Sequence, residues 1–146
     1  MRVLIDTDVV LDLMLKRPAF FADAFALWQA GDQGRYQRYI AAITPINAFY
    51  VARKFMDLAS ARQAIGELLG NVTVCVIDGN VLSAAHSSAM TDFEDAVQVE
   101  AARVAGIDIL VTRNTSDYQL APMTVLTPAE FLARLNQPSA TPPPES

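Results

Sequence analysis

The chain has 146 residues, of which 52% are hydrophobic and 18% charged, and its formal net charge at pH 7 is −5. This size and composition predict one folded domain and exclude a wholly disordered chain, a membrane-spanning segment and strong non-specific nucleic-acid binding by the whole surface. The single cysteine, Cys75, excludes an internal disulfide and a thiolate-rich metal site, and it favours a cytoplasmic location.

Short apolar runs alternate with stretches of helical periodicity along most of the chain. In chain order the predicted elements are a strand at 3–5, helices at 8–16 and 20–30, a strand at 39–43, helices at 45–56 and 60–69, a strand at 72–77, helices at 80–89 and 93–105, strands at 109–111 and 125–126, and a helix at 128–135. The remainder, residues 136–146, is rich in proline and has no apolar anchor. We therefore predict one domain over residues 1–135 and a disordered tail behind it.

This alternation predicts an α/β fold, in which a parallel sheet of about five strands carries helices on both faces. Ligands bind such sheets beyond the carboxyl ends of the strands. The polar residues that follow predicted strand ends, directly or within one helical turn, are Asp6, Asn47, Thr112, Arg113, Asn114 and Asp117. These residues are candidates for a functional site.

The helix that follows Thr91 begins with the sequence "DFEDA". Asp92 and Asp95 are three residues apart and share a helix face, so Asp6, Asp95 and Asp117 are predicted to converge, with Asp92 close by. Clustered carboxylates repel one another unless a cation neutralises them. Oxygen ligands without histidine or cysteine suit Mg²⁺ or Mn²⁺, which support phosphodiester and phosphoryl chemistry.

Five segments together resemble the PIN domain family, the metal-dependent ribonuclease fold found in the toxins of VapC-type toxin–antitoxin pairs. The segments are "LIDTDVVLDLMLKR", "AAITPINAFYVARK", "DFEDAVQ", "ILVTRNTSDY" and "VLTPAEFL", and the resemblance extends over residues 3–132. It implies a three-layer α/β/α sandwich with strand order 3-2-1-4-5. It also implies an endoribonuclease that leaves 5′-phosphate and 3′-hydroxyl ends, forms a homodimer and can have an antitoxin partner.

The resemblance assigns roles to individual residues. Asp6, Asp95 and Asp117 match the catalytic, metal-binding acids, and Asp92 matches an accessory metal ligand. Asn47 occupies a helix position at which many members carry Glu, so the chain is similar to a subgroup with Asn there. The remaining expected roles are accessory ones for Asn47, Thr112 and Asn114, and RNA contacts for Arg53 and Arg113.

Simpler roles remain open for several of these residues. Asp6 and Asp92 also suit helix capping, and Asp117 suits a turn. Arg113 suits a surface salt bridge as well as a phosphate contact, and Arg53 suits the negative end of a helix.

Two other functions fit parts of the sequence. The first is a haloacid-dehalogenase-like phosphatase, because "DTDVV" at residues 6–10 fits the nucleophile loop of that family with Asp6 as nucleophile. Its late acid pair should directly follow a strand, however, and "DFEDA" has no apolar strand before it. The second is a non-catalytic PIN domain that binds RNA or a partner protein, since Asn47 and Asn114 are amides where related chains often carry acids.

Overall fold

A computed structural model describes residues 1–137 of the chain. Apart from residues 136 and 137, the predicted disordered tail lies outside the described residues. None of the helices in the described part has the length and apolar character needed to cross a bilayer.

Five parallel strands form one sheet, in the order β3-β2-β1-β4-β5. The strands are β1 (Arg2–Ile5), β2 (Gln37–Ala41), β3 (Thr73–Cys75), β4 (Ile109–Val111) and β5 (Thr124–Leu126). Strand β1 is central, with Leu4 aligned to Tyr39 of β2 and to Leu110 of β4. The predicted α/β class, the number of strands and their order are therefore confirmed.

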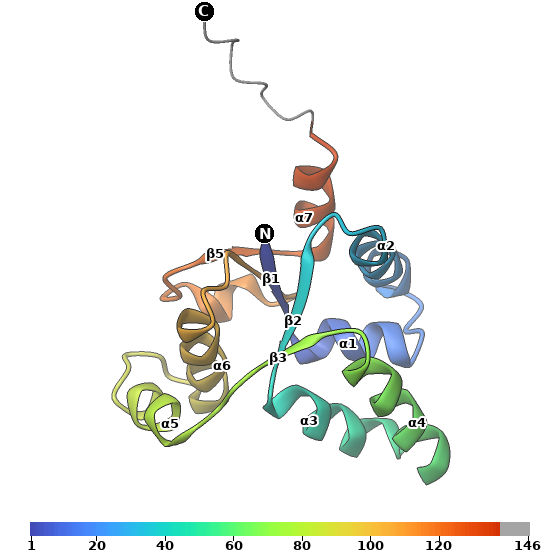
Figure 1. Ribbon diagram of the computed structural model, residues 1–146, viewed down its shortest axis with the longest axis horizontal. Coiled ribbons are helices and arrows are strands. Elements are labelled where there is room, and N and C mark those ends of the chain that lie inside the picture. Colours follow the sequence, from blue (N-terminus) through green and yellow to red (C-terminus); the bar gives the residue numbers. More distant parts are fainter. Residues whose placement is uncertain (138–146) are drawn as a thin grey trace, which may run out of the picture.

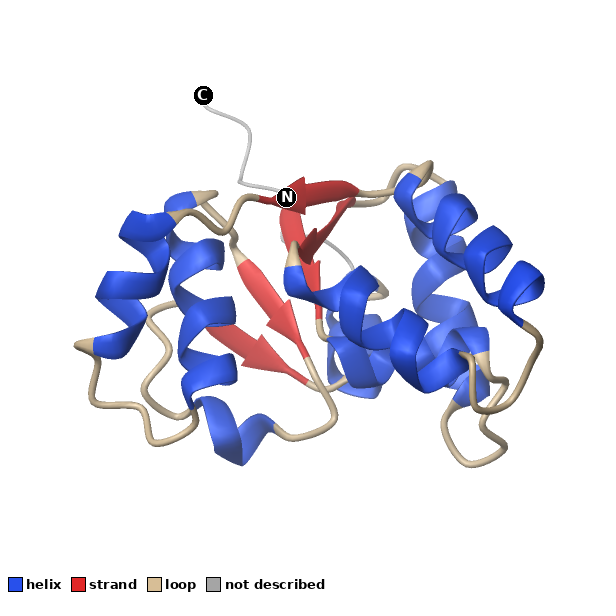
Figure 2. Ribbon diagram, turned by 90° about the horizontal axis from the view of Figure 1, so that it is seen from below, coloured by secondary structure: helices blue, strands red, loops and turns tan. Residues whose placement is uncertain are grey.

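Helices cover both faces of the sheet (Figures 1 and 2). The helices α5 (Gly79–His86) and α6 (Phe93–Val104) pack together on one side. On the other side lie α1 (Thr7–Met14), α2 (Phe21–Asp32), α3 (Ile43–Ala52), α4 (Leu58–Leu69) and α7 (Pro128–Leu135). A 3₁₀ turn, η1 (Thr115–Tyr118), follows β4.

Alternating side chains of the strands build two separate cores. Val3 and Ile5 of β1 are buried in the core that also contains Phe131 of α7. Leu4, between them in sequence, belongs to the opposite core with Ala102 of α6. Successive strand side chains point to opposite faces, so an all-apolar strand stabilises both layers of helices.

The prediction differs from the structure in the start of one helix and in one element that it lacks. Helix α3 begins at Ile43, not at residue 45, and Pro45 is its third residue. The first-turn N–H groups of a helix have no intrahelical acceptor, so proline is tolerated there. Turn η1 was not predicted at all, because its four residues, "TSDY", show no apolar periodicity.

Candidate active site

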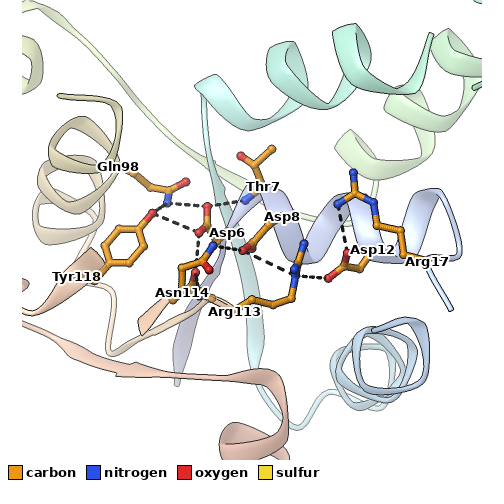
Figure 3. A network of polar contacts seen from close by, with 10 residues as sticks. Asp6, Thr7, Asp8, Asp12, Arg17, Gln98, Arg113, Asn114 and Tyr118 are labelled. Atoms are coloured by element: carbon orange, nitrogen blue, oxygen red, sulfur yellow. Dashed lines mark hydrogen bonds and ion pairs between the residues drawn. The ribbon is translucent and has the colours of Figure 1, made fainter. Parts of the chain in front are cut away.

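Asp6 lies at the end of β1, and its carboxylate accepts four hydrogen bonds from the protein (Figure 3). Oδ1 accepts from the backbone N–H of Thr7 at 2.7 Å, which confirms Asp6 as the cap of α1, and from Nε2 of Gln98 at 3.0 Å. Oδ2 accepts from Oγ1 of Thr112 at 2.8 Å and from the hydroxyl of Tyr118 at 3.2 Å. A carboxylate offers about four acceptor positions, so these donors fill all of them.

Gln98 and Tyr118 are site residues that the sequence analysis missed. Each is 3% exposed. Nε2 of Gln98 donates to the Tyr118 hydroxyl at 2.8 Å, and this hydroxyl also lies 3.0 Å from Oδ1 of Asp95. Burial, reinforced by the charges of Asp6 and Asp95, raises the pKa of Tyr118 far above its usual value, so the phenol remains a hydrogen-bond donor.

A sequence signal existed for one of these two residues. Gln98 follows Asp95 by three positions on α6 and therefore shares its helix face. Tyr118 had no such signal, because its position depends on the unpredicted turn η1.

Asp92 and Asp95 lie at the start of α6. Oδ1 of Asp92 accepts from the backbone N–H of Asp95 at 2.9 Å, which confirms Asp92 as the cap of α6. Burial is the largest cause that raises the pKa of Asp95 to about 6, and the charges of Asp92, Asp6 and Asp117 act in the same direction. The hydrogen bond from Tyr118 partly opposes them. The charge of Asp95 is therefore repelled by three other carboxylates, and a cation bound among them would relieve this repulsion.

Three of the four predicted acids line one pocket. The pocket has a volume of about 350 Å³ and is lined by Asp92, Asp95 and Asp117 together with polar and apolar neighbours from α6, η1 and the loops beside them. The fourth acid, Asp6, is connected to this pocket through Tyr118, whose hydroxyl contacts both Asp6 and Asp95. The structure thus brings the predicted acids together around Tyr118 and the pocket.

The donor chemistry of this pocket fits a hard divalent cation that keeps part of its water shell. Within residues 1–137, no three carboxylate, imidazole or thiolate groups are arranged to hold one ion directly. Mg²⁺ usually retains several waters and binds one or two carboxylates directly, so it does not need three. Asp95 and Asp117 provide oxygen donors of the right kind beside the pocket.

Asn47 lies at the same edge of the sheet and contacts α6. Its Nδ2 donates to Oε1 of Glu94 at 2.6 Å. One turn earlier on α3, Oγ1 of Thr44 lies 2.9 Å from Oγ1 of Thr7, the residue after Asp6. The structure therefore places Asn47 near the predicted site, and it brings there one more carboxylate, Glu94, to which the sequence analysis gave no role.

Arg113 is held in an ionic cluster on the other side of Asp6 (Figure 3). Its Nε lies 2.8 Å from Oδ2 of Asp12, a residue that is 1% exposed, and its guanidinium lies 4.0 Å from the ring centre of Phe20. Asp12 also pairs with Arg17 at 3.3 Å. The salt bridge predicted for Arg113 is present, but its partner is buried, so it is not the surface pair that was predicted. Its contact with RNA stays a prediction.

Thr112 and Asn114 link the carboxylate of Asp6 to that of Asp8 through hydrogen bonds. Oγ1 of Thr112 donates to Asp6 and accepts from the backbone N–H of Asn114 at 3.1 Å. Nδ2 of Asn114 donates to Oδ2 of Asp8 at 3.1 Å. Through these contacts Thr112 orients the carboxylate of Asp6 and Asn114 orients that of Asp8. The accessory roles predicted for both residues stay a prediction.

The surroundings of Asp8 destabilise its ionised form, so the stability of the protein should depend on pH through this residue. Burial is the largest cause that raises the pKa of Asp8 from 3.8 to about 6, and the charge of Asp6 adds to it. Its Oδ1 is buried and has no hydrogen-bond partner among the described residues. Because the folded-state pKa is raised, Asp8 imposes a folding cost that is absent below pH 3.8, grows as the pH rises to about 6, and is fully present above that.

We therefore expect Asp8→Asn to stabilise the protein by about 1–2 kcal/mol at pH 7.5. The advantage should grow as the pH rises from about 4 to about 6 and stay constant above that, which urea unfolding at several pH values would measure. Asp23→Asn, at an exposed acid of α2, is the matched control and should show no such pH-dependent gain. An advantage of Asp8→Asn that did not change with pH would contradict an origin in the raised pKa of this carboxyl.

Arg53 is exposed at the end of α3, where its guanidinium lies 4.6 Å from the ring centre of Tyr50. It is the more accessible of the two predicted RNA contacts. Its predicted position at the negative end of a helix is confirmed, since it is the C-cap residue of α3.

The geometry does not support Asp6 as a phosphatase nucleophile. Between α5 and α6 the described chain contains no strand, so the acids of α6 do not follow a strand end. Both oxygens of Asp6 are also occupied by protein donors.

Comparison with known proteins gives one family and a set of similar folds. A sequence model of the PIN domain matches residues 2–116. No curated protein sequence matches the chain significantly. Among solved structures, VapBC-1 from nontypeable Haemophilus influenzae is similar with a TM-score of 0.67 and 16% identity, over 88% of this chain and 99% of the other.

Two further solved structures have the same fold at low identity. A toxin–antitoxin complex from Klebsiella pneumoniae gives a TM-score of 0.65 and 23% identity, over 86% of this chain and 97% of the other. VapC20 of Mycobacterium tuberculosis, described as a toxin that cleaves the sarcin–ricin loop, gives a TM-score of 0.60 and 16% identity, over 74% of this chain and 86% of that one.

Proposed function

Because the chain belongs to the PIN domain family, we propose that it is an endoribonuclease that hydrolyses phosphodiester bonds of RNA with the help of Mg²⁺ or Mn²⁺. The observation that carries the proposal is the gathering of Asp92, Asp95 and Asp117 around one pocket, with Asp6 joined to Asp95 through Tyr118. The raised pKa of Asp95 supports it, because the repulsion among these acids is what a bound cation would relieve.

In this proposal the ion supplies a Lewis acid that activates water and stabilises charge on the phosphate. Asp95, from α6, and Asp117, from η1, would hold the ion beside the pocket, and Asp6 would join them where the Tyr118 hydroxyl gives up its place. Asp92 stabilises the first turn of α6 by capping it, which fixes the position of Asp95. Tyr118 orients the Asp95 carboxylate, and Thr112 and Gln98 hold Asp6.

An exposed apolar surface supports the proposal that the protein has protein partners. Four large side chains on α3, in the connection to α4 and at the first residue of α4 are more than half exposed, namely Ile46, Tyr50, Phe55 and Leu58. Such a patch is typical of an interface. We propose a homodimer through this surface, and an antitoxin as a further partner, since one of the similar structures is a toxin–antitoxin complex.

A non-catalytic PIN domain that binds RNA or a protein is the second candidate. The observation that favours it is the environment of Asp6, whose acceptor positions are all filled by protein donors. In that case the Asp6 carboxylate would stabilise the edge of the sheet through its hydrogen bonds and would not bind an ion.

Removal and return of the metal ion would test the nuclease. We expect the purified protein to leave a mixed RNA pool intact in excess EDTA and to cleave it after Mn²⁺ or Mg²⁺ is restored, with 5′-phosphate ends on the products. Cleavage is read by gel electrophoresis, and the ends by their susceptibility to a 5′-phosphate-dependent exonuclease.

Two results would argue against the proposal. Equal cleavage in EDTA and in Mn²⁺ would indicate a metal-independent activity or a contaminant. No cleavage together with no Mn²⁺ binding in calorimetry would favour the non-catalytic domain.

A further inference from the structure

The hydroxyl of Tyr118 lies between the carboxylates of Asp6 and Asp95. It is 3.2 Å from Oδ2 of Asp6 and 3.0 Å from Oδ1 of Asp95. The side chain is 3% exposed, and its oxygen accepts a hydrogen bond from Gln98 at 2.8 Å. The phenol is thus fixed as a neighbour that the two acids share.

Tyr118 and Gln98 do not carry enough hydrogens to complete the hydrogen bonds to both Asp6 and Asp95. The Tyr118 hydroxyl carries one hydrogen and can donate it to Asp6 or to Asp95, but not fully to both. The amide of Gln98 already uses its two hydrogens, one on Asp6 and one on Tyr118. One of the two carboxylates therefore faces the phenol oxygen with an incomplete hydrogen bond.

A cation that bridged the two acids would need the position that the hydroxyl holds. Thr7, Thr112 and Gln98 occupy three of the roughly four acceptor positions of Asp6, and the Tyr118 hydroxyl lies at the fourth. Tyr118 is the donor most easily given up. Its contact with Asp6 is the longest of the four, and Thr7 donates from the backbone of α1.

We propose that the Tyr118 hydroxyl competes with the divalent cation for Asp6 and Asp95, and thereby limits how tightly this chain binds the ion. The proposal rests on the proposed function, because it concerns the same acids. Tyr118 is in this sense a positioning residue that sets the affinity of the site. A variant without the hydroxyl leaves two carboxylates facing each other without a shared donor, which favours the ion.

Calorimetric titration of Mn²⁺ into the wild-type protein and into Tyr118→Phe would test this. Phenylalanine keeps the buried ring and removes only the hydroxyl. We expect Tyr118→Phe to bind Mn²⁺ about tenfold more tightly, the change that corresponds to one hydrogen bond to a charged group no longer being displaced. In the wild type, Mn²⁺ should also change the ultraviolet absorption of tyrosine, and Tyr118→Phe should lack this change.

Tyr36→Phe is the matched control. Tyr36 is also buried, and its hydroxyl donates to the carbonyl of Leu27 at 2.5 Å, within the core on the opposite side of the sheet. This variant loses a buried hydroxyl of the same kind, so its Kd for Mn²⁺ should equal that of the wild type.

Each outcome decides the proposal. Tighter binding by Tyr118→Phe alone, including binding where the wild type shows none, supports it. Equal or weaker binding by Tyr118→Phe, with Mn²⁺ bound by the wild type, overturns the competition and leaves the proposed nuclease standing. No binding by any of the three proteins overturns both the competition and the metal-dependent function.

Discussion

Asp95→Asn is expected to lower the rate of RNA cleavage by about 10³-fold or more, the largest effect on activity that the structure predicts for a single change. Asparagine keeps the shape of the side chain and an oxygen that can accept from Tyr118, but it removes the charge that would hold the ion. Single-turnover cleavage of an RNA pool in Mn²⁺ would measure the rate. Calorimetry should show weaker Mn²⁺ binding in parallel.

Loss of folding would not explain this loss of activity. Because burial and the neighbouring acids raise the folded-state pKa of Asp95 to about 6, the charge that Asp95 carries at pH 7.5 costs folding free energy relative to the unfolded chain. Asp95→Asn removes that cost, so its Tm at pH 7.5 should be at least as high as that of the wild type.

Asp57→Asn is the matched control for Asp95→Asn. Asp57 caps α4 through the backbone N–H of Ser60, and it lies outside the candidate site. Asparagine caps helices as well as aspartate does, so this variant removes the same charge and should cleave RNA at the wild-type rate. Metal-dependent cleavage by Asp95→Asn at the wild-type rate would show that Asp95 does not hold the ion.

Asp12→Ala is expected to have the largest effect on stability, a loss of about 3 kcal/mol in the free energy of unfolding. The change would leave the half-buried guanidinium of Arg113, packed on Phe20, without its closest acid. Asp8 is the other acid near it, with 3.9 Å between Oδ2 and Nε. Urea unfolding should show a lower midpoint with an unchanged m-value.

Two further variants would separate the buried pair from an ordinary surface pair. Glu100→Ala breaks the pair of Glu100 with Arg103, whose side chain is 57% exposed, and should cost less than about 1 kcal/mol. The double change Asp12→Leu with Arg113→Met should recover much of the loss, because no unpaired charge of the Asp12–Arg113 pair remains. A loss below about 1 kcal/mol for Asp12→Ala would contradict a strong contribution of this pair to stability.

The fold and the main acids were predictable because their signals are local. Each strand shows as a short apolar run, and each parallel crossover except the one from β4 to β5 shows as a helical segment between two such runs. Asp6 could be placed at the end of β1 because it follows Ile5 directly, and that placement is confirmed. The strand order came from the resemblance, not from the periodicity.

The ionic cluster beside the site was not predictable in the same way. Asp12 lies between Leu11 and Leu13 in a helical pattern, where a carboxylate ordinarily indicates a solvent-facing position. It is buried because Arg113, from beyond β4, reaches it. The spacing of residues in the sequence does not predict a contact between residues so far apart. The contact between Tyr118 and Asp6 was not predictable for the same reason.

The pairing of β1 with β4 has a consequence for when the candidate site comes into existence. Residues at the start of the chain align with residues from 109 onward, and the backbone N–H of Asp6 donates to the carbonyl of Val111. Contacts of such large sequence separation form only after a long loop has closed. A chain still emerging from the ribosome carries Asp6 and then Asp95 well before Thr112 and Tyr118 are available to hold them. The assembled site is therefore a property of the completed polypeptide, and fragments that end before β4 lack it.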